Sequence, residues 1–184
     1  LLAAAKEMKY LYEDQIIPET IYPVEMEHAA KFGDLELYFR PIRPSDERLF
    51  QEYLYKLSER SVYLRFFQVR RDFPHELAQE MVAVDYQENM GIVATLGNSD
   101  TAPIVAAGHW MMDFNENMAE VAFSVSDEHQ RQGIGTHLLH FLMRAGRERG
   151  LHGSLILHVA VRKDGSVEGI RVVRSSGEPL LDEA

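Results

Sequence analysis

One segment of the chain, residues 118–150, constrains the fold more than any other. It begins with a strand-like run at 119–125 and continues through a short acidic loop to a turn with two glycines, QRQGIGT at 130–136. A stretch with the apolar spacing of an amphipathic helix follows at once. Its apolar residues are Leu138, Leu139, Phe141, Leu142 and Ala145. The segment therefore predicts a strand, a glycine turn and a helix in direct succession.

The glycine turn suits the binding of an anion. Glycine lets a ligand approach the main chain closely, and the amides at the start of a helix point outward. The helix dipole adds to the attraction. The turn lacks the third glycine of the dinucleotide fingerprint, and no lysine follows Gly135 as the P-loop requires. We therefore interpret the turn as a site for a pyrophosphate held by backbone amides.

Composition restricts the partners of the chain. Its 184 residues suit one domain with a sizeable core, and 19 basic against 29 acidic residues give a net charge of −10. This charge argues against non-specific binding to nucleic acid or to an anionic membrane, and it is compatible with a basic substrate, although solubility alone explains it equally well. No run approaches the roughly 20 apolar residues of a membrane span. Without cysteine there is no disulfide and no cysteine nucleophile, and a cytoplasmic location is expected.

The remaining pattern predicts an α/β fold, of the α+β kind. Residues 1–31 are interpreted as a helical or irregular N-terminal segment, because a helix-like stretch at 2–12 is followed by Pro18 and Pro23. A strand is expected from Leu35, with Leu35, Leu37 and Phe39 on one face. After it we expect helices at 44–57, 58–67 and 74–84, then strands at 91–96, 104–112 and 119–125.

The turn resembles the acetyl-CoA-binding motif of the GNAT acetyltransferase superfamily, Gln/Arg-x-x-Gly-x-Gly/Ala, which is met by Gln130, Gly133 and Gly135. The resemblance covers about residues 32–152. Within the superfamily, RPIRP at 40–44 and the blocks LSERS at 57–61 and RFF at 65–67 are similar to GNAT domains attached to acyl-CoA synthetase and CoA-transferase enzymes, the protein-lysine acetyltransferase group. The resemblance implies a mixed, mostly antiparallel sheet flanked by helices, acetyl-CoA as co-substrate, and a larger CoA-enzyme chain as a possible partner.

The tail, residues 153–184, departs from this resemblance. The helix that GNAT domains usually place there is missing, and the tail is similar instead to part of the TonB C-terminal domain family. The Asp164-Gly165 turn between two β-rich runs, 154–161 and 170–173, predicts a β-hairpin without reference to any family. We therefore expect an atypical C-terminal hairpin beside the acetyl-CoA slot.

The resemblance implies which residues hold acetyl-CoA. Strand residues Phe123, Ser124 and Val125 would pair with the pantetheine arm. The backbone of the turn would hold the pyrophosphate. Its residues are Gln130, Arg131, Gln132, Gly133, Ile134, Gly135 and Thr136.

Glu120 is the candidate catalytic base. A carboxylate inside an apolar strand needs a reason, and related lysine acetyltransferases carry a base glutamate on this strand. The alternatives are His109, for which a structural role is preferred, and Asp113. His137 and His140 share a helix face at a spacing that could bind a metal, but no further ligands are evident and no metal site is expected.

Three functions fit the sequence. The preferred one is an N-acetyltransferase that moves acetyl from acetyl-CoA to a primary amine, such as a protein lysine, by direct attack in a ternary complex. The second is a non-catalytic domain that senses acetyl-CoA or acyl-CoA, favoured by the unusual tail and by the lack of tyrosine in 153–184, where many GNAT enzymes carry their acid. In the third, the tail hairpin contacts another protein by pairing its strands with those of the partner.

Overall fold

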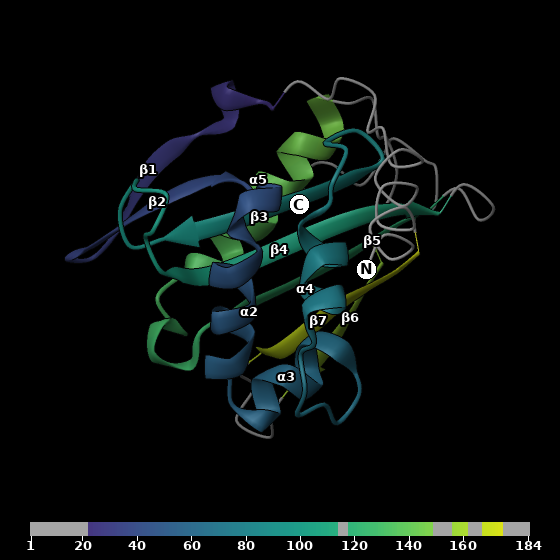
Figure 1. Ribbon diagram of the computed structural model, residues 1–184. Helices are drawn as coiled ribbons and strands as arrows, with labels where there is room; N and C mark the ends of the chain where they lie inside the picture. The colour runs from purple at the N-terminus through teal and green to yellow at the C-terminus, as the bar shows by residue number, and fades with distance from the viewer. Residues whose placement is uncertain (1–21, 114–117, 149–155, 162–166, 175–184) are drawn as a thin grey trace, which may run out of the picture.

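The computed structural model of the protein describes residues 22–113, 118–148, 156–161 and 167–174. The elements follow one another in the order that Figure 1 shows. The strands are β1 (His28–Phe32), β2 (Leu35–Pro41), β3 (Asn89–Thr95), β4 (Ile104–Asp113), β5 (Met118–Val125), β6 (Ile156–Val161) and β7 (Val167–Arg174). The α-helices are α2 (Glu47–Lys56), α3 (Glu59–Phe66), α4 (His75–Val82) and α5 (Ile134–Glu148), and the 3-10 turns are η1 (Val24–Met26), η2 (Pro44–Asp46) and η3 (Asp127–His129).

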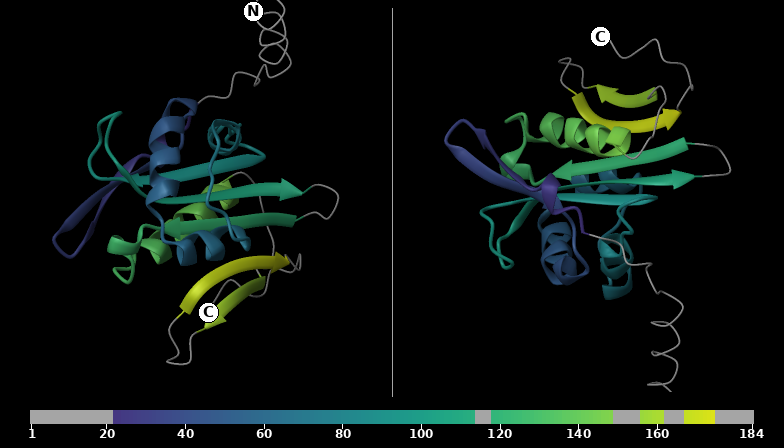
Figure 2. Two further views of the ribbon diagram at one scale, coloured as in Figure 1. Left: turned by 60° about the horizontal axis from the view of Figure 1, so that its bottom comes forward. Right: turned by 90° about the horizontal axis from the view of Figure 1, so that it is seen from above.

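The centre of the molecule is a five-stranded sheet in the order β1-β2-β3-β4-β5, in which every pair is antiparallel. Helices α2 and α4 cover one face and α5 the other, as the right-hand view of Figure 2 shows. Buried side chains from both sides of the sheet form the core, among them Phe39, Phe50, Ile92 and Leu138. The expected sheet flanked by helices is therefore confirmed, and the helices and strands of residues 35–148 lie where the sequence predicted them within a few residues.

Strand β1 was not predicted from the sequence. Part of the segment expected to be helical or irregular pairs with β2, from His28 opposite Phe39 to Phe32 opposite Leu35. Gly33, at the turn between the two strands, has a φ of 62°, which glycine adopts at little cost. The pattern was missed because Ala29 and Ala30 favour a helix by propensity and give no clear alternation of apolar and polar residues. The expected helix at 2–12 lies outside the described residues.

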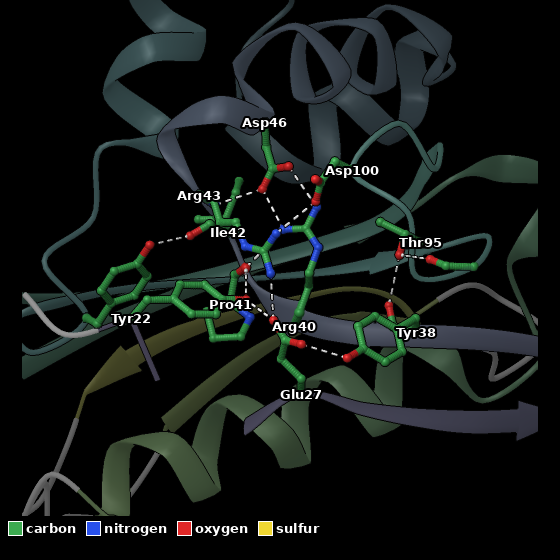
Figure 3. A network of polar contacts seen from close by, with 12 residues as sticks. Tyr22, Glu27, Tyr38, Arg40, Pro41, Ile42, Arg43, Asp46, Thr95 and Asp100 are labelled. Atoms are coloured by element: carbon green, nitrogen blue, oxygen red, sulfur yellow. Dashed lines mark hydrogen bonds and ion pairs between the residues drawn. The ribbon is translucent and has the colours of Figure 1, made fainter. Parts of the chain in front are cut away.

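A buried ion pair determines where β2 ends and α2 begins. Both terminal nitrogens of Arg40 bond the carboxylate of Asp46, at 2.6 and 2.7 Å, and the two residues are 3% and 2% exposed. The same carboxylate accepts the backbone N–H of Arg43 at 2.7 Å. Pro44 stands at the first turn, where its missing N–H costs nothing. Figure 3 shows this pair at the centre of a polar network.

The network extends to the segment that precedes β1. Arg43 bonds Glu27 at 2.7 Å and Asp100 at 3.1 Å, and its guanidinium lies 4.7 Å from the centre of the Tyr22 ring. Glu27 also accepts hydrogen bonds from the hydroxyls of Tyr22 and Tyr38 (Figure 3). Burial alone would raise the pKa of Glu27. The hydrogen bonds from Tyr22, Tyr38 and Arg43 lower it by a larger amount, so the pKa lies below the ordinary value. The segment before β1 is thereby held to the sheet.

Helix α5 lies close to the sheet at Gly108 of β4. A Cβ atom on Gly108 would come within 2.7 Å of Leu142 and 3.1 Å of Phe123, so no side chain fits there without a shift. The close packing fixes the height of α5 above β4 and β5. It thereby also places the first turn of α5, which follows the glycine turn, against β5.

Strands β6 and β7 form the predicted C-terminal hairpin and pair antiparallel as a separate two-stranded sheet. The second strand, β7, is the one that lies beside β5, and in Figure 2 it runs in the opposite direction to β5. It does not join the hydrogen-bonded ladder of the large sheet. The predicted Asp164-Gly165 turn lies outside the described residues.

We predict that Asp46→Asn destabilises the protein by about 3 kcal/mol, because it leaves the buried Arg40 guanidinium without a counter-charge. The free energy of unfolding in urea measures this loss. Asp100→Asn is the matched control: its carboxylate is 90% exposed and its pairing with Arg43 should be worth less than about 0.5 kcal/mol. Equal effects of the two substitutions would show that the buried pair has no special weight.

Candidate functional site

The glycine turn has the backbone conformation that its sequence suggested. Gly133 has a φ of 87°, in the region that favours glycine, and Arg131 has a φ of 60° despite its side chain. The chain then enters α5 at Ile134, which is 1% exposed and anchors the turn to the core. The left-handed residues turn the chain sharply from η3 into the helix.

The amides at the start of α5 are open to an external acceptor. The N–H of His137 donates to the carbonyl of Gly133 at 3.0 Å, so the amides of residues 134–136 precede the first helical bond. Gly133 and Thr136 are exposed, and Gly135 is half-buried. An anion at this turn would therefore meet unpaired helical N–H groups and the positive end of the helix dipole.

The strand before the turn presents its side chains alternately to the two faces of the sheet. Phe123 and Val125 lie toward α5, where a Cβ on Gly135 would be 3.5 and 3.7 Å from them. Ser124 lies on the opposite face, and its hydroxyl is 2.8 Å from that of the buried Tyr53 of α2. This alternation is the ordinary one of a β-strand, which the sequence predicted for residues 119–125. The outer edge of β5 is not part of the sheet's ladder, and β7 lies beside it without pairing to it.

The side chain of Gln130 has a structural position that the sequence analysis did not assign. Its amide nitrogen donates to the hydroxyl of Ser61 on α3 and to the carbonyl of Val125, both at 3.0 Å. The first residue of the motif thus connects the end of β5, the turn and α3. Its side chain holds the turn, while its backbone belongs to the predicted pyrophosphate site.

Asp127 is a second residue that sequence reasoning missed. Its carboxylate accepts the backbone N–H of Ser58 at 2.9 Å and the hydroxyls of Ser58 and Ser61 at 2.6 and 2.8 Å. Burial raises the pKa of Asp127, but the hydrogen bonds from the two serines outweigh it, so the pKa lies below the ordinary value. A partial signal existed, because Ser58 before Glu59 is a typical start of a helix.

Among the three candidate bases, the structure describes the side chain of His109 alone. The backbone of Glu120 lies in β5 opposite Met111, but its side chain and that of Asp113 lie outside the described residues. His109 donates from Nε2 to the carbonyl of Met81 at 2.9 Å, and its buried Nδ1 has no partner among the described residues. Burial, with a smaller effect of the positive Arg65, lowers the pKa of His109 to about 3. The imidazole therefore stays neutral and has a structural place.

His137 is paired with His28 of β1 and does not point to a metal. Their Nε2 atoms lie 3.0 Å apart, and Nδ1 of His28 is 3.0 Å from the carbonyl of Met26. Because a carbonyl only accepts, Nδ1 of His28 is the donor to Met26, and in the neutral form of the pair His137 donates to Nε2 of His28. Phe39 and Phe141 enclose the two rings. The hairpin β1–β2 is thereby attached to the first turn of α5.

The described part of the chain contains no group of three or more His, Asp or Glu side chains arranged to hold a metal ion. Within the same residues, none of the helices has the length and apolarity to cross a membrane.

Comparison with known proteins relates the site to a family. The sequence pattern of the acetyltransferase (GNAT) family matches residues 47–168. Acetyltransferase Pat of Mycolicibacterium smegmatis is 33% identical over 103 residues, which are 55% of this chain and 30% of that protein. An acetyltransferase of Pseudomonas aeruginosa is 23% identical over 111 residues, 60% of each chain. The chain therefore spans less than two thirds of the length of either relative.

Solved structures show the same fold. The GNAT domain of S. lividans PAT superimposes with a TM-score of 0.68 at 22% identity, covering 82% of this chain and 97% of that domain. The ribosomal-protein-S5-alanine acetyltransferase of Vibrio fischeri gives a TM-score of 0.55 at 12% identity, covering 79% and 93%. At these identities the likeness shows the fold alone.

The pair of His28 and His137 predicts a pH dependence of stability. Burial lowers the pKa of His137, and the charges of His28, Arg144 and His140 lower it further. The folded protein thus takes up this proton less readily than the unfolded chain, so stability is lost as pH falls below about 6.5, toward the folded pKa. Because His137 is only partly buried, we expect a loss below about 1 kcal/mol.

Urea unfolding at pH 7 and pH 5 measures this loss. His137→Gln, which keeps a neutral hydrogen-bonding group, should reduce the difference in the free energy of unfolding between pH 7 and pH 5. His140→Gln, on the exposed side of the same helix, should change it only slightly, because His140 is the smallest of the causes that lower the pKa of His137. An unaltered pH dependence in His137→Gln would remove His137 as its source.

Proposed function

This chain belongs to the acetyltransferase (GNAT) family, and from that membership we propose that it transfers acetyl from acetyl-CoA to a primary amine. The observation that carries the proposal is the turn at residues 130–136, with its left-handed Gly133 and the solvent-open amides at the start of α5. These amides would hold the pyrophosphate of acetyl-CoA. The backbone of Phe123, Ser124 and Val125, on the outer edge of β5, would pair with the pantetheine arm.

The reaction would proceed by direct attack. A primary amine with an ordinary pKa near 10.4 must lose a proton before it attacks the thioester carbon, and we propose Glu120 as the base that receives it. A backbone N–H of β5 would bond the developing oxyanion. The carbon–sulfur bond then breaks, and the CoA thiolate leaves and takes up a proton. Since the chain has no cysteine to form an acyl-cysteine intermediate, a ternary complex is the simplest route.

A protein lysine is the acceptor that we propose. The net charge of −10 suits a cationic substrate, and the relative in Mycolicibacterium smegmatis is named acetyltransferase Pat. Because the chain spans only part of its relatives, we further propose that it acts with additional chain or with a larger CoA enzyme. The cytoplasm, where acetyl-CoA and protein lysines meet, is the proposed location.

A second function is favoured by the C-terminal region. Residues 153–184 contain no tyrosine, and the strand beside β5 is β7 and not β6, the strand that directly follows α5. Both features fit a domain that binds acetyl-CoA or acyl-CoA and regulates an attached enzyme, but does not itself catalyse a reaction. Release of CoA in the presence of lysine peptides distinguishes the two functions, because a sensor would release none.

We predict that acetyl-CoA binds the parent chain at one site in calorimetry and that Gly135→Glu weakens binding at least about tenfold. The new carboxylate would occupy the turn and repel the pyrophosphate. Gly135→Ala is the matched control, since its Cβ would meet its neighbours at ordinary contact distances and should preserve binding. Absence of binding by the parent chain would overturn the proposed function.

The role of Glu120 predicts a different pattern. Glu120→Gln should lower turnover by about 100-fold or more, because the amine loses its base, while acetyl-CoA affinity stays nearly unchanged. Steady-state kinetics beside calorimetry measure the two quantities. Equal loss of turnover and affinity, or loss of neither, would remove Glu120 from this role.

A further inference from the structure

The loop between β5 and α5 is attached to the start of α3 by one carboxylate. Asp127 begins η3, three residues before Gln130. Its three hydrogen bonds go to Ser58 and Ser61, of which Ser58 is the N-cap of α3 and also accepts the backbone N–H of Ser61 at 3.2 Å. An acidic group at a helix N-terminus is favoured by the helix dipole. Asp127 therefore takes, at α3, the place that an external anion would take.

The same cluster reaches the glycine turn through Ser61. The hydroxyl of Ser61 accepts from Gln130, and Gln130 in turn bonds the carbonyl of Val125. Ser61 is 6% exposed, so this connection is shielded from water. Both ends of the loop, the end of β5 and the first residue of the turn, are thus held to one point on α3.

The turn needs such a restraint. Arg131, directly after Gln130, has a φ of 60°, a conformation that costs a residue with a side chain on the order of 1 kcal/mol. Its side chain is exposed, so packing around that side chain does not hold it there. The hydrogen bonds of Gln130, on the neighbouring residue, are the restraint that the structure shows.

We propose that Asp127 is a positioning residue for the pyrophosphate. Together with Ser58, Ser61 and Gln130 it holds the glycine turn in the conformation that receives the ligand, and it does not touch the ligand itself. This inference rests on the proposed function. The chain closes the start of α3 with its own carboxylate, while the start of α5 remains open to solvent.

Two donors that differ in the pyrophosphate test this role. Acetyl-CoA carries the pyrophosphate and S-acetylpantetheine does not, and transfer to a lysine peptide is measured with each. Asp127→Ala should weaken the use of acetyl-CoA about tenfold through KM, with kcat and the reaction of S-acetylpantetheine unchanged. Asp127→Asn, which retains an acceptor for the Ser58 amide, should recover part of the loss. Glu128→Ala is the control, because it removes the same charge from the next, exposed residue.

Equal loss with both donors would show that Asp127 supports the domain as a whole and would overturn the positioning role, as would no change with either. A separate measurement needs no ligand: nitrogen-15 relaxation of the Gly133 and Gly135 amides should show increased motion in Asp127→Ala but not in Glu128→Ala. If the parent chain neither binds acetyl-CoA nor transfers acetyl, the proposed function fails, and the relaxation result alone decides whether Asp127 holds the turn.

Discussion

The bidentate contact of Arg40 with Asp46 is the interaction on which the rest of the arrangement depends. It joins the end of β2 to the last residue of η2, directly before α2, and also fixes the backbone of Arg43. A buried ion pair adds little net stability over an apolar pair of the same volume, but its geometry is specific. From this start α2 brings Tyr53 to Ser124 on β5 and Phe50 to the ring of His109 on β4. The face of β5 opposite α5 is therefore ordered by a contact at the far end of α2.

The sequence predicted what depends on local pattern. Strand alternation in β5, the glycine turn and the amphipathic α5 are all encoded within about 30 consecutive residues, and they are found where expected. Membership of the acetyltransferase family confirms the resemblance based on Gln130, Gly133 and Gly135. Strand β1 was missed, because a short alanine-rich strand is defined by its partner β2 and not by its own residues.

Contacts between distant parts of the chain were not predictable. His28 and His137 are separated by 109 positions, and Asp127 and Ser58 by 69, so no spacing rule connects them. The helical spacing places His137 and His140 on one face of α5, but it does not show that the ring of His137 turns toward His28 of β1. Gln130 shows a related limit: the motif identifies the residue, but only the fold shows that its side chain bonds Ser61 and Val125.

The position of β7 has a consequence for solubility. A strand at the end of a sheet exposes unpaired backbone groups, and such an edge invites strands of other molecules and promotes aggregation. If the edge admits the extended ligand proposed above, it cannot be closed by a permanent ladder. Strand β7 lies beside β5 without joining its sheet, so it hinders a foreign strand at this edge without forming a ladder with β5. The hairpin thus covers this edge, while no hydrogen-bonded ladder fixes it to β5.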